Sequence, residues 1–330
     1  MLFFSPSLII TAIGLAIAYF WAGLDGLTVA FLLALLQVAL SFDNAIVDAT
    51  ILRNMSPKWQ KRFLTWGMLF AVFGVRMLLP LAIVAFTSRL SLGDVARMAA
   101  HQPEVYAQHI GAAQNQISAF GGMYLLMLFF SFFFQGSQTI HWIAWLEKRL
   151  IRLGQIASIE VALALLTLIT LQSFLATEQK QPVVIAGLVG VVLFLFIKSL
   201  SEILDSENPQ KRTRRGLDAF IFLEVLDMSF SLDSVIGAFA MSQDIVIILI
   251  GLTIGAIVVR QMTLFMVKKS TLDYFLFLEH GAHYAIGALA ILMLFTLFQK
   301  IPDLMIGGIG LGIILVSLWA SIRHQRNTVE

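Results

Sequence analysis

The heptapeptide L-S-F-D-N-A-I at residues 40–46 has a counterpart, F-S-L-D-S-V-I, at residues 230–236, an offset of 190 positions. Both lie within long apolar stretches, and both place an aspartate near the middle, at Asp43 and at Asp233. A charge at the centre of a membrane-spanning helix costs about 2.5–3.5 kcal/mol even on lenient insertion scales. Two such charges at matching positions are hard to obtain from shared composition alone, so the pair indicates an internal repeat.

The correspondence continues outward from these two heptapeptides. The next apolar segment of each copy has a Gly followed nine residues later by Arg, and the third has a Gly followed three residues later by Tyr. These residues are Gly67 with Arg76, Gly251 with Arg260, Gly121 with Tyr124, and Gly281 with Tyr284. Three successive segments therefore match in order, which predicts two three-helix repeats.

The composition is that of a membrane protein. Hydrophobic residues make up 59% of the 330 positions and charged residues only 13%, whereas a soluble domain carries roughly a quarter charged residues. The chain has no cysteine, which excludes disulfides and thiolate metal sites and leaves oxygen and imidazole as metal ligands. No basic patch suggests a nucleic-acid partner. The fold class we expect is all-α and polytopic, embedded in a lipid bilayer.

A spanning helix needs about 20 mostly apolar residues, and ten segments qualify. They are roughly 7–23, 27–52, 63–88, 117–137, 158–177, 182–204, 217–241, 244–267, 272–298 and 302–322. The first is predicted to be a membrane helix and not a signal peptide, because no basic residue precedes it. Residues 89–116 are predicted to form the one long loop, and 141–152 an amphipathic helix at the interface.

These segments divide a single membrane domain, 1–330, into four parts. They are the first repeat at 27–137, a linker with the interfacial helix and two further helices at 138–216, the second repeat at 217–298, and a last helix with a cytoplasmic tail at 299–330. Of the 22 Lys and Arg residues, fifteen fall on one side of this arrangement and four on the other. The positive-inside rule places the fifteen, and both termini, in the cytoplasm.

The first helices of the two repeats are five crossings apart, so they should run in opposite directions. Inverted repeats of this kind place a binding site near the middle of the membrane and permit alternating access. Polar residues recur at helical spacing in both of these helices. They are Gln37, Ser41, Asn44 and Asp48 in the first, and Glu224, Asp227, Ser231 and Ser234 in the second.

Clusters of carboxylate, amide and hydroxyl oxygens suit Mg²⁺, Ca²⁺ or Mn²⁺. Asp43 and Asp233 lie about 100° round from the polar stripes of a regular helix, so they join the same cavity only if the helices are unwound there. Glu279 and His283 share one helix face at an i,i+4 spacing. An imidazole beside a carboxylate would shift selectivity from Mg²⁺ and Ca²⁺ toward Mn²⁺ or another transition-metal ion.

Several of these residues also have structural interpretations. Arg76 and Arg260 either neutralise the two repeated aspartates as buried pairs or couple ion binding to movement. Asp48 is either part of the polar stripe or a charge at a helix end. Glu279 and His283 are either ligands or a hydrogen-bonded pair.

Five stretches of the sequence resemble a known family of integral membrane proteins, the TerC family. Residues 40–45 and 227–234 are similar to its paired aspartate signatures, and 120–124, 141–147 and 278–284 look like a bacterial branch described only as a domain of unknown function. The resemblance covers roughly residues 27–322. It implies inverted three-helix repeats related to the LysE-type exporters, with Mn²⁺ efflux or metal homeostasis as activity and tellurium resistance as a historical label.

By that resemblance four residues are candidate ion ligands: Asp43, Asn44, Asp233 and Ser234. The family commonly has Glu six residues before the first aspartate, where this chain has Gln37, so ion stoichiometry or proton coupling can differ here.

The function we expect is export of a divalent cation, with manganese favoured, across a bacterial plasma membrane. The ion would be cargo, with no permanently bound cofactor, and the oligomeric state is left open. An intramembrane enzyme is disfavoured because zinc-protease, aspartyl-protease and serine-hydrolase motifs are absent. A membrane scaffold that takes part in metal homeostasis without transport of its own remains the alternative.

Overall fold

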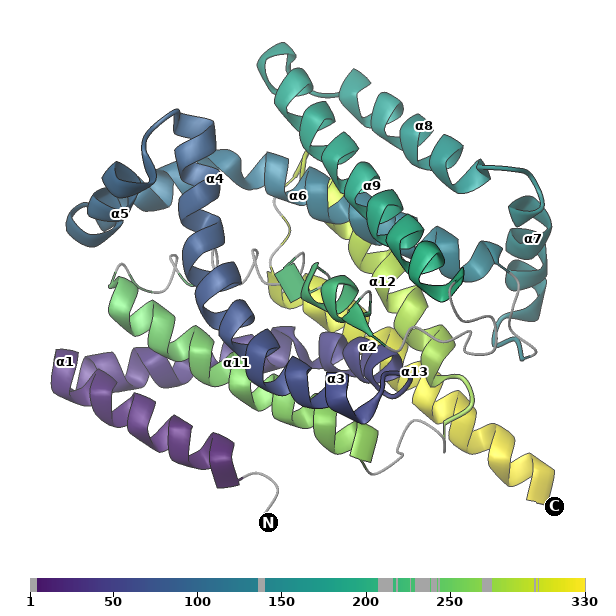
Figure 1. The fold of residues 1–330 in the computed structure, drawn as a ribbon, viewed down its shortest axis with the longest axis horizontal. Helices are drawn as coiled ribbons and strands as arrows, with labels where there is room; N and C mark the ends of the chain where they lie inside the picture. The colour runs from purple at the N-terminus through teal and green to yellow at the C-terminus, as the bar shows by residue number, and fades with distance from the viewer. Residues whose placement is uncertain are drawn as a thin grey trace.

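A computed structural model of the chain describes residues 5–135, 140–206, 216–217, 219–225, 227–228, 238, 242, 244–268, 275–299, 301 and 303–329. Within these ranges the secondary structure is helical and contains no strand. The prediction of an all-α, polytopic membrane protein is therefore confirmed. Figure 1 shows the helices packed side by side, with the C-terminal helix extending beyond the rest.

The helices follow one another with short connections. Their bounds are α1 (Ser5–Leu40), α2 (Phe42–Leu52), α3 (Pro57–Arg62), η1 (Phe63–Gly67), η2 (Phe70–Leu78), α4 (Leu79–Ser88), α5 (Leu92–His101), α6 (Pro103–Phe134), α7 (Ala144–Gly154), α8 (Ile159–Ser173), α9 (Thr177–Ser206), α11 (Ile245–Lys268), α12 (Leu278–Phe295) and α13 (Asp303–Val329). The segments η1 and η2 are π-helical.

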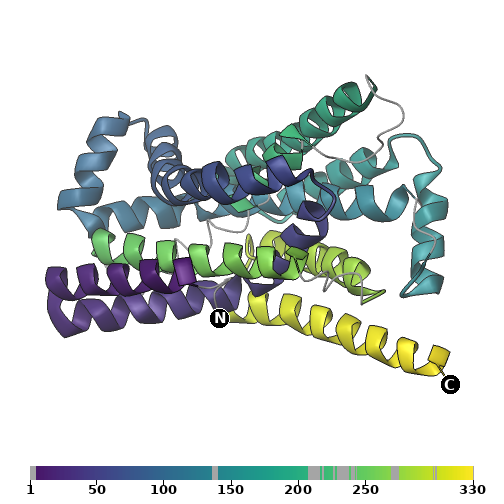
Figure 2. The same cartoon turned by 60° about the horizontal axis from the view of Figure 1, so that its bottom comes forward.

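Helix α1 doubles back on itself at Ala22 and Gly23, whose backbone is not helical. Gly23 has φ +67°, a conformation that glycine adopts without the steric cost that other residues bear. Figures 1 and 2 both show the two arms of α1 lying side by side. The break that the sequence predicts between residues 23 and 27 is therefore present, and the first two expected segments are the two arms.

Both arms of α1 pack against α11, and small residues permit the close approach. In the first arm, Gly14 faces Ile254. In the second arm, the backbone of Ala30 and the side chain of Leu33 leave no room for a side chain at Gly251. Packing through small residues is the usual way that membrane helices associate, because lipid supplies no hydrophobic drive between helices.

The start of α11 is fixed by a side chain beyond its first turn. Asp244 accepts hydrogen bonds from the backbone N–H groups of Val246, at 2.9 Å, and Ile247, at 3.3 Å. The indole Nε1 of Trp21 donates to the other carboxylate oxygen of Asp244 at 3.0 Å. The cap therefore also fastens the turn of α1 to the start of α11.

The larger core is formed by α2, α6, α8, α9, α12 and α13. Its centre is Tyr124 of α6, which is fully buried and lies edge-on to Phe194 of α9 with ring centroids 5.8 Å apart. Figure 1 shows α6 running through the middle of the molecule beside α9 and α12. Many large apolar side chains face outward, for example Phe20 and Phe196, as expected of helices that contact lipid.

Each of the ten predicted segments except 217–241, which lies mostly outside the described residues, coincides with helical structure. Five stretches of the described chain are long and apolar enough to cross a membrane: Ser7–Val38, Pro103–Phe134, Thr177–Ser199, Ile245–Lys268 and Leu278–Phe295. A bent pair, α7 with α8 at 100°, makes a sixth candidate. The count of ten crossings stays a prediction, because Ser7–Val38 doubles back and residues 63–88 are divided among η1, η2 and α4.

Two details of the predicted layout are wrong. The expected loop at 89–116 is α5 and the first part of α6. Ser91 caps α5 by accepting from the backbone N–H of Asp94 at 3.1 Å, and Pro103 occupies the first turn of α6, which is a favourable position for proline. The expected tail after residue 322 is also helical, since α13 continues to Val329.

Candidate functional site

The helix that carries the first aspartate motif is interrupted within the motif. Helix α1 ends at Leu40 and α2 begins at Phe42, with Ser41 between them at φ −107° and ψ 13°. The side chains of Ser41 and Asn44 are buried at this junction. Discontinuous helices expose backbone groups at the membrane midplane, which is how many transporters build ion sites.

A buried ion network lies on α11 and the residues at 219–228. The guanidinium of Arg260, which is 2% exposed, donates from Nη2 to Asp227 Oδ2 at 2.6 Å and to Glu224 Oε2 at 3.2 Å. Its Nη1 donates to the backbone carbonyl of Phe63 at 2.7 Å. A single guanidinium therefore joins two carboxylates to the first π-helical turn.

The π-helical segment lies close to this network because Gly67 has no side chain. A methyl group there would collide with the carboxylate of Glu224 and with the guanidinium of Arg260. Single π-helical turns inside longer helices are frequent at functional sites. The ring of Phe63 also covers the guanidinium, with Cζ of Arg260 4.1 Å from the ring centroid.

Asp48 of α2 adds a third carboxylate to the electrostatic environment of Arg260. It is 1% exposed. One guanidinium against three carboxylates, those of Asp48, Glu224 and Asp227, leaves two formal negative charges among the described residues if all are ionised. A divalent cation would balance that charge.

Gln37 ends the same polar stripe on α1. Its Nε2 donates to Ser41 Oγ at 2.7 Å, while Oε1 is buried without a hydrogen-bond partner in the described part of the chain. The side chain lies against Gly255 of α11, where no other side chain would fit. The structure therefore brings Gln37, Ser41 and α11 together, as the polar stripe predicted, at the helix interruption.

Several predicted site residues cannot be placed in this arrangement. The backbone of Asp43 is the second residue of α2 and that of Arg76 lies in η2, but their side chains are outside the description. Asp233, Ser234 and Ser231 lie entirely outside the described residues. Their roles stay predictions.

Glu279 and His283 have other partners than a shared ion. The carboxylate of Glu279 pairs with Arg53 at 2.7 Å. Nδ1 of His283 lies 2.8 Å from the backbone oxygen of Glu279, and its ring stacks on Phe132 with centroids 3.4 Å apart. These contacts favour the structural interpretation of the pair, and the ligand role stays a prediction.

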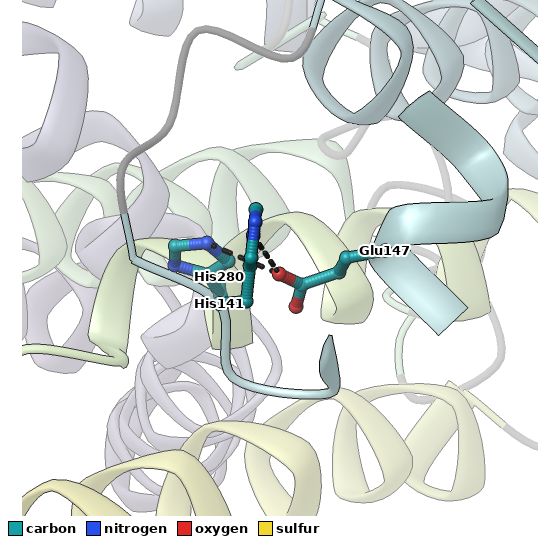
Figure 3. Close-up of side chains that lie close together, drawn as sticks. All are labelled: His141, Glu147 and His280. Carbon is teal, nitrogen blue, oxygen red and sulfur yellow. Dashed lines mark hydrogen bonds and ion pairs between the residues drawn. The ribbon is translucent and has the colours of Figure 1, made fainter. Parts of the chain in front are cut away.

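A second polar cluster joins the start of α7 to α12. Figure 3 shows His141, Glu147 and His280 pointing toward one another, with dashed lines from both imidazoles to the same carboxylate. Their candidate ligand atoms all lie within 4.8 Å of one another, and this is the one group of three or more such residues in the described ranges.

The sequence analysis did not predict this cluster. It placed 141–152 in an interfacial helix and considered His280 only as a neighbour of Glu279. His141 and Glu147 are six residues apart, which is not a spacing of one helix face, and His280 follows from a distant helix. The signal that was available is the burial of Glu147, the first-turn acidic residue of an otherwise basic α7.

The comparisons with known proteins give one family match. A family model described as "Protein of unknown function (DUF475)" matches residues 42–328. No curated protein and no solved structure matches the chain. The matched region contains both aspartate motifs, the Arg260 network and the cluster at His141, Glu147 and His280.

Proposed function

The chain belongs to the DUF475 family, and we propose that it is a membrane transporter of divalent cations, with export of manganese as the favoured activity. The observation that carries the proposal is the buried Arg260 network. Its carboxylates outnumber its guanidinium among the described residues. Intramembrane ionisable groups are costly, and they typically mark ion pathways.

The interruption at Ser41 supports the same function. It opens the backbone immediately before Asp43 and beside the polar stripe that ends at Asp48. Oxygen ligands from carboxylates, an amide and freed carbonyls together suit a hard or borderline divalent ion. The resemblance to the TerC family is what favours manganese and an outward direction across the bacterial plasma membrane.

The two arms of the proposed pathway would come from inverted repeats. In the structure, Gly67 of the first repeat lies against Glu224 of the second, and Gly251 of the second lies against Ala30 and Leu33 of the first. Such an exchange of contacts between equivalent elements is what a two-fold relation in the membrane plane produces, and it supports rocking of one repeat against the other.

The alternative is a membrane scaffold without transport of its own. Its support is that Asp227 and Glu224 already compensate Arg260 closely, as a structural ion network does. In that case loss of a carboxylate would impair assembly, whereas in a transporter it would impair flux in a well-assembled protein.

The test is flux of Mn²⁺, Mg²⁺, Ca²⁺ and Zn²⁺ in vesicles that contain the purified protein. We expect Mn²⁺ flux in the parent protein and a loss of more than about tenfold in Asp227→Asn, with normal insertion. The control is Asp94→Asn, which alters an exposed carboxylate on α5. Absence of flux of all four ions in correctly inserted parent protein would overturn the proposal.

A further inference from the structure

The carboxylate of Glu147 is held in one orientation by its neighbours. Its Oε1 accepts from the backbone N–H groups of Trp142, at 3.2 Å, and Ile143, at 3.0 Å, and from the hydroxyl of Tyr284, at 3.2 Å. Three donors occupy this oxygen, so Oε2 is the atom left to bind something else. Hydrogen bonds of this kind orient the ligands of metal sites.

Oε2 of Glu147 faces two imidazoles. It lies 3.1 Å from Nδ1 of His141 and 3.6 Å from Nε2 of His280. Ligands about 2.1 Å from a tetrahedral ion are about 3.4 Å from one another. The observed separations are close to that value, so an ion between the three atoms needs only small side-chain shifts.

The imidazole of His280 is buried without an ordinary hydrogen bond. Its side chain is 5% exposed, and neither ring nitrogen has a partner of normal geometry among the described residues, although the backbone of Ile140 lies nearby. Buried polar groups are normally satisfied. An imidazole nitrogen directed at Oε2 of Glu147 but too far away to bond to it is arranged as a metal ligand would be.

The charge of Glu147 also lacks a fixed counter-ion. The residue is 1% exposed, and its ion pairs in the described chain are with His141 and His280 alone. A buried carboxylate without a compensating charge costs several kcal/mol. A divalent ion between the three side chains would supply that charge.

We propose that His141, Glu147 and His280 bind a resident first-row transition-metal ion at a site separate from the transport pathway. Two imidazoles and one carboxylate favour zinc and its neighbours over Mg²⁺ and Ca²⁺. The side chain of His141 is 22% exposed, so water can enter the fourth position from that side. The ion would fasten the start of α7 to α12.

Aromatic side chains enclose the other sides of this site. Trp142 and Tyr284 have ring centroids 5.7 Å apart, and Phe133 lies 4.5 Å from Tyr284. Phe132 lies edge-on to His280 at 5.8 Å. A hydrophobic enclosure limits access of solvent to a bound ion and strengthens its electrostatic attraction to ligands.

The test uses the full chain, purified in detergent, stripped of metal and titrated with Co²⁺ as a spectroscopic probe. We expect binding of one Co²⁺ with the visible absorption of a tetrahedral site, displaced by Zn²⁺ and not by Mg²⁺. His280→Gln and Glu147→Gln should each weaken binding by more than about tenfold, and Tyr284→Phe, which only orients Glu147, by about tenfold or more.

Two variants control for other sites. His101→Gln changes an exposed histidine on α5, and Asp227→Asn changes the transport pathway; both should retain the Co²⁺ spectrum. The inference is overturned if the parent chain binds no Co²⁺, or if His280→Gln keeps the spectrum. Loss of the spectrum in Asp227→Asn alone would assign the ion to the transport pathway and also contradict the inference. Because binding is read without transport, failure here leaves the proposed function untouched.

Discussion

At the scale of single residues, the transport proposal depends on Asp43 and Asp233. A hard divalent ion gives up its hydration shell only for several oxygens, some of them anionic. Substitution by Asn keeps the size of each side chain and removes its charge. Asp43→Asn and Asp233→Asn should therefore each reduce Mn²⁺ flux in vesicles by more than about tenfold, with near-normal expression and insertion. Parent-level flux in both inserted variants would eliminate the site we propose.

Arg260 has the opposite character, because it compensates carboxylates and does not bind the cation. Arg260→Met would leave Glu224 and Asp227 buried without a counter-ion, and removing one partner from a buried pair destabilises by about 3–5 kcal/mol. Thermal unfolding in detergent should show a lower midpoint in this variant. A double variant with Glu224→Gln should recover part of the loss, and Arg97→Met, on the exposed surface of α5, should lose little. An unchanged midpoint in Arg260→Met would mean that the network does not hold α11 to the residues at 219–228.

At the scale of helices, the close contacts depend on glycine. Gly67→Ala places a methyl group against Glu224 and Arg260, so it should displace η1 and lower both the unfolding temperature and Mn²⁺ flux. Gly111→Ala on α6 meets no atom within 4 Å, and it should be neutral or stabilising by up to about 1 kcal/mol, since alanine favours helices over glycine. Equal behaviour of the two variants, measured side by side, would contradict the packing described here.

Helices were also the level at which the sequence was most informative. Apolar segments and the break near Gly23 follow from composition and from Asp25 and Gly26, because lipid tolerates no unsatisfied backbone in a crossing. The interruption at Ser41 could not be located in that way, since an apolar run looks the same whether or not its helix is continuous. The sequence motif suggested only that Asp43 would need such an interruption to reach the polar stripe.

The candidate site divides along the same line. Charges in register with helical spacing, such as Glu224, Asp227 and Arg260, were identifiable as a constellation, although the structure pairs Arg260 with these two carboxylates where the sequence suggested Asp233. The cluster at His141, Glu147 and His280 was not identifiable. Its members come from a short segment and a distant helix, and such contacts depend on tertiary packing that no local period encodes.

At the scale of the whole molecule, the positions of the helix ends accord with the proposed orientation. Figure 1 shows the turn of α1 and α5 at one side of the molecule, and α7 and the C-terminus at the other. The first group belongs to the loops poor in Lys and Arg, and the second to loops rich in them. The same division is expected if the two repeats cross the membrane in opposite directions.

The chain has no cysteine, so single cysteines can report this topology without background. Lys58→Cys and Thr213→Cys precede and follow an odd number of predicted crossings from Gln102→Cys, so the first two should react with a membrane-impermeant thiol reagent from the cytoplasm and the third from outside. Lys58 and Gln102 are both exposed, so a lack of reaction there cannot be attributed to burial. Each variant should be labelled fully once the membrane is opened by detergent, which controls for access. If Lys58→Cys and Thr213→Cys react from opposite sides, the segments between them cross the membrane an odd number of times. The two repeats would then run in the same direction, and the alternating-access mechanism built on their inversion would fail with it.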